Sequence, residues 1–210
     1  MTLAEPENRR ARVSHIWDRE ENEHYVESAW VGRRLFQVER FEGEVCDPCC
    51  GIGNMAEGAR AAGLEVRAFD IVDRGYEHLT GTRDFLQSRQ RFCNFATNPP
   101  FDRIREFTEL AVRLAERKVA VVFPVRRLNA AGAWLKALPL ARVYFLTPRP
   151  SMPPGHVYRE CIAKGREPSG DTKDYAICVF IKNYEGEPVT RWLHRDGDAA
   201  PQPTIIGGQA

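Results

Sequence analysis

A chain of 210 residues is long enough for one domain with a substantial core and too short for two large ones. Its composition, 43% hydrophobic and 28% charged with a net charge of +1, is typical of a globular protein and excludes a disordered or fibrous chain. No apolar run reaches the length of a membrane span and no secretion signal is visible at the start, so we expect a cytoplasmic protein.

Strand and helix patterns alternate along the chain after a polar, loose segment at 1–14. We expect strands at 43–47, 64–70, 91–97, 119–124, 141–146 and 174–184, and helices at 30–36, 55–63, 103–118 and 130–138. The fully apolar run at 119–124 is typical of a strand that is buried on both faces of a parallel sheet. This alternation predicts one doubly wound α/β domain over residues 15–194, followed by a flexible tail at 195–210.

The first unusual stretch, DPCCGIGN, follows the strand at 43–47. Gly51, Gly53 and Ala56 fit the glycine pattern of dinucleotide-binding turns, and Asp70 closes the next strand, where a carboxylate can accept from ribose hydroxyls. However, Asp47 would place an anion beside a pyrophosphate, so the stretch favours a cationic or amino-acid ligand. Solvated acids at strand ends are the alternative interpretation of Asp47 and Asp70.

The second unusual stretch is TNPPFD, at the end of the strand 91–97. The exocyclic amine of an aromatic ring is a poor nucleophile, because its lone pair is delocalised. Two acceptors that grip its hydrogens, the Asn98 side-chain oxygen and the Pro99 carbonyl, would localise the lone pair and aim it. Pro100 would stiffen the turn and Phe101 would stack on the ring. The stretch therefore predicts a clamp for a planar amine, with a simple turn as the alternative.

Cysteine spacing gives a weaker signal. Cys46 and Cys49 form a C-x-x-C pair, which occurs in zinc and redox sites. A zinc site needs a second pair at matching spacing, and the sequence has none. We therefore expect reduced, buried thiols and no metal site.

Taken in order, DPCCGIGN, the strand-end FD, RDF and NPPF resemble the S-adenosylmethionine-dependent N6-adenine DNA methyltransferases of class I fold, especially the small stand-alone forms of bacteria and their phages. The resemblance covers residues 24–184. It implies a Rossmann-like, mostly parallel sheet of seven strands with an antiparallel late strand, S-adenosylmethionine as the cofactor, and methyl transfer to adenine N6 in DNA. The segment HYVESAW at 24–30 has Glu27-Ser28 where the family has Thr-Pro, so no role is carried over to it.

The resemblance also assigns residues to the two halves of the site. It implies cofactor binding by Asp47, Pro48, Gly51, Gly53, Asp70, Asp84 and Phe85, and target binding by Asn98, Pro99, Pro100 and Phe101. The same N-P-P-aromatic signature occurs in enzymes that methylate RNA or a protein glutamine amide, and a non-catalytic cofactor-binding or nucleic-acid-binding module is a further alternative. An NAD-dependent dehydrogenase would explain the two glycines but not NPPF.

Substrate recognition is expected to be simple. Only the segment 147–174 is spare after the core elements, and we expect it to form a loop on the substrate side. Residues 101–150 contain ten basic against four acidic residues, which favours a polyanionic partner, and the resemblance implies that this partner is DNA. The candidate contacts are Arg126, Arg127, Arg149, His156 and Lys173. With no separate recognition domain, we expect low sequence selectivity or a separate specificity partner, and action on a flipped or single-stranded base.

Overall fold

The computed structural model describes residues 24–197. The predicted loose segment 1–14 and residues 198–210 of the predicted tail lie outside the described residues, as do residues 15–23 of the predicted domain. Among the described residues, no helix is long and apolar enough to cross a membrane.

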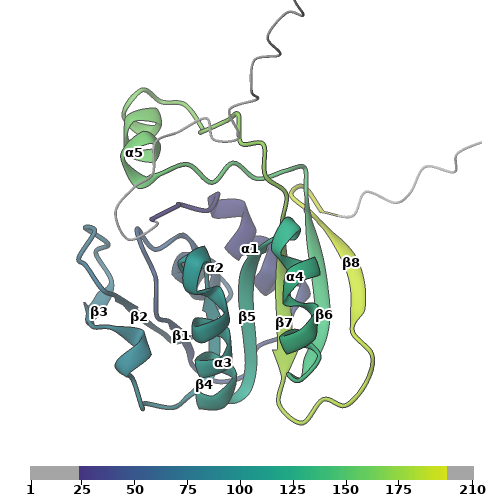
Figure 1. Ribbon diagram of the computed structural model, residues 1–210. Helices are drawn as coiled ribbons and strands as arrows, with labels where there is room; N and C mark the ends of the chain where they lie inside the picture. Colours follow the sequence, from purple (N-terminus) through teal and green to yellow (C-terminus); the bar gives the residue numbers. More distant parts are fainter. Residues whose placement is uncertain (1–23, 198–210) are drawn as a thin grey trace, which may run out of the picture.

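Eight strands and five α-helices alternate along the described chain (Figure 1). The strands are β1 (Val45–Asp47), β2 (Val66–Asp70), β3 (Leu79–Thr82), β4 (Phe92–Thr97), β5 (Ala115–Pro124), β6 (Leu140–Thr147), β7 (Tyr175–Ile181) and β8 (Val189–His194). The helices are α1 (Ala29–Val38), α2 (Asn54–Ala61), α3 (Ile104–Leu114), α4 (Val125–Leu135) and α5 (Gly155–Ala163), with short 3-10 turns η2 (Phe85–Gln87) and η3 (Phe101–Arg103).

All strands belong to one sheet in the order β3-β2-β1-β4-β5-β7-β6-β8. Every neighbouring pair is parallel except those of β7, which runs antiparallel to β5 and β6. The prediction of a doubly wound, mostly parallel sheet with an antiparallel late strand is confirmed. The predicted number of seven strands is wrong, because β8 pairs with β6 and adds an eighth at the edge. Five of the six residues of β8 are exposed, so this strand lacks the apolar pattern of the central strands.

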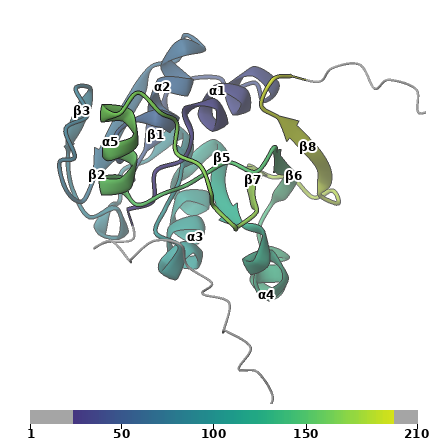
Figure 2. The ribbon, with the colours of Figure 1, turned by 90° about the horizontal axis from the view of Figure 1, so that it is seen from above.

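Helices cover both faces of the sheet. Seen from above, α1 and α2 lie on one side of the sheet and α3 and α4 on the other (Figure 2). The crossing of α1 and α2 is close because it is made of glycines: a Cβ on Gly58 would lie 2.4 Å from the backbone carbon of Gly32. This contact brings the start of α2 against the segment that precedes α1, and that arrangement shapes the site.

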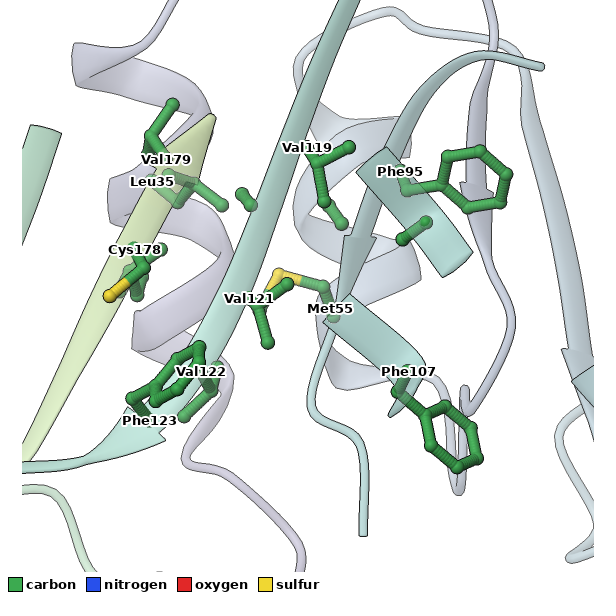
Figure 3. Close-up of a cluster of buried hydrophobic side chains, with 14 of the residues drawn as sticks. Leu35, Met55, Phe95, Phe107, Val119, Val121, Val122, Phe123, Cys178 and Val179 are labelled. Carbon is green, nitrogen blue, oxygen red and sulfur yellow. The ribbon is translucent and has the colours of Figure 1, made fainter. Parts of the chain in front are cut away.

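The core is built around the central strand β5. Its Val119, Val121, Val122 and Phe123 are no more than 1% exposed. Leu35 of α1, Met55 of α2 and Phe107 of α3 gather around β5 and its neighbours (Figure 3). Because residues 119–124 of β5 are covered on both faces, they form a continuous apolar run, as the sequence predicted. Trp192, in contrast, lies on the edge strand β8 and is 63% exposed.

The predicted boundary between the helix at 103–118 and the strand that follows it is wrong. The amphipathic pattern suggested a helix as far as residue 118, but α3 ends at Leu114 and β5 begins at Ala115. The ion pair between Lys118 and the buried Glu39, with an N–O distance of 2.7 Å, accompanies this early start of the strand. The segment 147–174 is also more than a loop, because it contains the helix α5.

Candidate functional site

A cavity of about 390 Å³ lies where the carboxyl ends of β1, β2 and β4 meet. In an open parallel sheet this edge is where ligands bind, and the volume is within the usual range for small-molecule sites. The cavity is lined by residues 24–27, 48–52 and 98–103, by Phe107, and by Asp70, Ile71, Arg74, Arg83, Asp84 and Phe85 of the β2 and β3 region. Nine of the eleven predicted catalytic and cofactor residues line it; Asp47 and Gly53 do not.

The glycine turn between β1 and α2 forms one wall of the cavity. Gly51 and Gly53 have φ angles of +55° and +96°, in the left-handed region that other residues rarely adopt. A Cβ on Gly53 would lie 2.2 Å from the Tyr76 ring, so the missing side chain makes room for Tyr76 and not for a ligand. Of the two glycines, only Gly51 lines the cavity.

Asp70 fastens this turn to the end of β2. Its Oδ2 accepts from the Gly51 amide at 2.8 Å and its Oδ1 from the Val72 amide at 3.1 Å, while the Arg74 guanidinium lies 3.5 Å from Oδ1. Each carboxylate oxygen has a second lone pair, so Asp70 keeps acceptor capacity toward the cavity that it lines.

The adjoining wall comes from η2. Asp84 caps this turn, with its Oδ1 accepting from the Leu86 amide at 2.9 Å. Phe85 packs into the core with its ring centroid 5.7 Å from those of Phe95 and Phe107, and it also borders the cavity. The wall is therefore apolar beside one carboxylate, an environment that suits a base and its ribose.

The opposite end of the cavity holds Asn98, directly after β4. Its Nδ2 donates to the Tyr25 carbonyl and to Glu27 Oε2, both at 2.9 Å. Because both partners are acceptors, the orientation of this amide is fixed: the nitrogen faces them and the oxygen faces away. Within the described part of the chain, the buried Asn98 Oδ1 has no hydrogen-bond partner.

The two prolines and Phe101 continue the same wall. Pro100 precedes η3, so the chain turns sharply after the two prolines. Phe101 is 7% exposed, and its ring centroid lies 5.9 Å from that of Tyr175 with an angle of 35° between the planes. The ring predicted to stack on a substrate is thus largely packed against Tyr175 of β7, and it also lines the cavity.

Two carboxyl groups of this region are buried: Glu27, which lines the cavity, and Asp47, which closes β1. Burial raises the pKa of Glu27 above its ordinary value, and hydrogen bonding to Asn98 opposes the rise. Burial also raises the pKa of Asp47 well above its ordinary value, with the negative charge of Glu27 adding to the effect. A cationic ligand would favour the ionised forms of both groups.

The pH dependence of stability tests this environment. A carboxyl whose pKa is raised in the folded state binds its proton more tightly there than in the unfolded chain. The stability that this group contributes is therefore fully present in acid and is lost as the pH rises from the ordinary Asp47 pKa of 3.8 through the raised value. As the pH rises above about 4, we expect the stability of the Asp47→Asn variant to fall less than that of the wild type. Urea unfolding across this range checks it, and identical pH profiles would contradict it.

The sequence missed the contribution of residues 24–27. His24, Tyr25, Val26 and Glu27 all line the cavity, although no role was assigned to them. The available signal was the position of HYVESAW at 24–30, the segment where the resembled family has Thr-Pro.

The substrate-side segment is docked onto these same residues. The Val26 amide donates to the Pro153 carbonyl at 2.9 Å and the Gly155 amide to the His24 carbonyl at 3.1 Å, while Tyr25 bridges to Pro154. This places α5 above the carboxyl ends of the strands on the β2 side of the sheet (Figures 1 and 2).

None of the five predicted substrate contacts lines the cavity. Arg126 and Arg127 lie in the first turn of α4, after the carboxyl end of β5. Arg149 pairs with Asp174 at 2.7 Å, His156 lies in α5, and the Lys173 ammonium lies 5.2 Å from the centre of the Tyr25 ring. All five are therefore at the sheet edge that holds Asn98, around the cavity and not inside it.

All six cysteines are free thiols, and Cys46 and Cys50 are buried beside the glycine turn. In the part of the chain that the structure describes, no three His, Cys, Asp or Glu side chains are grouped to hold a metal ion.

Solved structures identify the fold. The chain superposes on a proposed RNA methyltransferase from Pyrococcus horikoshii with a TM-score of 0.51 and 17% identity, over 73% of this chain and 81% of that one. A predicted O-methyltransferase from Agrobacterium tumefaciens gives a TM-score of 0.51 with 12% identity, over 79% and 85% of the two chains. The chain has the class I methyltransferase fold.

The M protein of the type I restriction enzyme EcoKI shares the fold as well, with a TM-score of 0.50 and 14% identity, over 73% of this chain and 43% of that longer one. No protein-family model matches the chain, and no curated protein matches it. At these identities the likeness establishes the class I fold, and the activity has to be argued from the site.

Proposed function

We propose that this protein transfers the methyl group of S-adenosylmethionine to an exocyclic amine. We further propose that this amine is adenine N6 in DNA, and that the protein selects its target sequence only weakly. The observation that carries the proposal is Asn98 Oδ1, a buried acceptor without a partner in the described chain, in an amide held by Tyr25 and Glu27 at the cavity wall. An orphaned buried acceptor is costly, and a target N–H would satisfy it.

The cavity fits the methyl donor, which supplies an activated, positively charged methyl sulfonium when bound. The carboxylates of Glu27, Asp70 and Asp84 on the wall would bind its ammonium group and ribose hydroxyls, and Phe85 would contact its base. The backbone at Gly51 can approach a ligand because no side chain stands there. Arg74, Arg83 and Arg103 also line the cavity, but the Glu27 and Asp70 carboxylates beside Gly51 suit this cation better than they suit the pyrophosphate of NAD.

The chain's own residues would then position the acceptor. Asn98 Oδ1 and the Pro99 carbonyl would accept the two hydrogens of the amine, which localises its lone pair and stabilises the positive charge that develops on nitrogen. Phe101 and the rigid Pro99-Pro100 pair would keep the ring in one plane. The base has to leave the duplex to reach this position, so single-stranded or flipped adenine is the expected form.

Replacing Asp70 tests the donor half. We expect Asp70→Ala to weaken binding of S-adenosylhomocysteine by about 1.5–3 kcal/mol, the value of a charge-assisted hydrogen bond. Titration calorimetry measures it. Asp73→Ala is the matched control, because Asp73 is an exposed acid outside the cavity whose Oδ1 only accepts from the Gly75 amide at 2.8 Å. Binding of NAD with no response to either methionine compound would refute the donor assignment.

The acceptor class is tested directly. Labelled S-adenosylmethionine would be incubated with the protein and separate pools of DNA, RNA and protein, followed by digestion and identification of the methylated product. We expect N6-methyladenine from DNA. Label in RNA or in a glutamine amide would show that the same reaction acts on those substrates. If no pool were labelled, the protein would be a non-catalytic binding module. A long, sharply defined target site would instead indicate a separate specificity partner.

A further inference from the structure

Glu27 joins the two halves of the cavity. Its Oε2 accepts from Asn98 Nδ2 at 2.9 Å, and its backbone carbonyl accepts from Asn54 Nδ2, at the start of α2, at 2.6 Å. Burial raises the pKa of this carboxyl, and hydrogen bonding to Asn98 and to the backbone amides of Glu27 and Met55 opposes the rise. The residue is 7% exposed and lines the cavity.

The two hydrogen bonds that Asn98 Nδ2 donates decide how its amide is presented. A carboxylate only accepts hydrogen bonds, and the Tyr25 carbonyl beside it does the same. Between two acceptors, the Asn98 amide has one favourable orientation, with both Nδ2 hydrogens used and Oδ1 turned away from Glu27. An amide that turned over would place Oδ1 against two other oxygens.

We propose that Glu27 is a positioning residue that fixes the Asn98 amide so that Oδ1 faces the target amine. This inference rests on the proposed function and deepens it, because it adds to the clamp a residue of another segment of the chain. Glu27 acts through Asn98 and does not itself contact the reacting nitrogen.

The isosteric change Glu27→Gln separates this role from simple packing. The introduced amide has the same shape but a single acceptor oxygen. Because that one oxygen has to serve every donor that the carboxylate accepts from, we expect the new NH₂ group to be left facing Asn98. Asn98 then turns over to accept from it, and the target loses its acceptor. We expect turnover to fall about 10- to 100-fold or more, approaching the loss of one aligned group at a transition state.

A reversed pair tests the mechanism. Asn98→Asp alone places two carboxylates against each other and is expected to be nearly inactive. Combined with Glu27→Gln, the introduced aspartate accepts from the introduced amide and again offers an oxygen to the target. Rescue is partial, because the Tyr25 carbonyl still loses its donor. We expect the double variant to exceed the product of the two single effects by at least about tenfold. Additive losses would overturn the inference.

A second measurement does not depend on activity. In ¹⁵N-labelled protein, the side-chain amide signals of Asn98 are identified by their loss in Asn98→Ala. We expect Glu27→Gln to shift these signals and to speed their hydrogen exchange. Glu39→Gln is the matched control, since Glu39 is also a buried carboxylate but pairs with Lys118 and Arg142 outside the cavity. Asn98 signals unchanged by Glu27→Gln would overturn the role of Glu27 even in an active enzyme. Shifted signals in a protein that methylates none of the pools would keep the Glu27–Asn98 coupling and reject the methyltransferase function.

Discussion

Asn98→Ala is expected to lower the turnover of methyl transfer by about 10²–10³, by analogy with the removal of one donor from an oxyanion hole. Affinity for S-adenosylhomocysteine should stay close to that of the wild type, because Asn98 lies at the target end of the cavity. The loss belongs to the chemical step, so kcat falls while KM for the methyl donor changes little. Single-turnover assays with saturating donor, combined with calorimetry, measure both quantities.

The matched control is Asn94→Ala. Asn94 belongs to the same strand β4, is also buried, and donates from Nδ2 to the carbonyls of Glu42 and Glu44, each at 3.0 Å. It lies outside the cavity. We expect this variant to be less stable than the wild type but to keep the turnover of the folded enzyme. If Asn98→Ala retained most of its turnover, the amine clamp would be rejected.

The sequence could predict that the site residues lie close together, because the carboxyl ends of parallel strands lie at the same edge of a sheet. Residues Gly51, Asp70 and Asn98 directly follow or close three strands that the apolar pattern reveals, so they had to meet at one edge of the sheet. The pattern could not show which side chains point into the cavity. Gly53 had the expected left-handed backbone, yet its space is filled by Tyr76, a residue from the loop after β2.

The parts that were missed depend on contacts between distant segments. Glu27 becomes part of the site because the close crossing of α1 and α2 brings it to Asn54 and Asn98, which are 27 and 71 residues away in sequence. The edge strand β8 is exposed and polar, so its residue pattern does not indicate a strand. It is a strand because it pairs with β6. Neither effect leaves a local signal.

Recognition of the substrate should be governed by charge at the edge of the sheet. Arg126 and Arg127 begin α4 directly after β5, whose carboxyl end neighbours that of β4. Arg149 is partly neutralised by Asp174, so its contribution should be smaller. Phosphate contacts of this kind release counterions, and each one steepens the dependence of binding on salt by about 0.9 log units per log unit of salt for duplex DNA.

We therefore expect DNA affinity to fall steeply with salt, and the double change Arg126→Ala with Arg127→Ala to make the slope shallower by about 2. The control removes two cations at the opposite edge of the sheet, Arg117→Ala with Lys182→Ala, where β5 begins and β7 has ended. Because the control alters the net charge by the same amount, a general field effect would change both slopes equally, whereas local phosphate contacts change only the first. Fluorescence anisotropy with adenine-containing oligonucleotides of randomised flanks at several salt concentrations gives the slopes. Equal slopes in all three proteins would show that α4 does not touch the nucleic acid, and binding insensitive to salt would point to a substrate without a phosphate backbone.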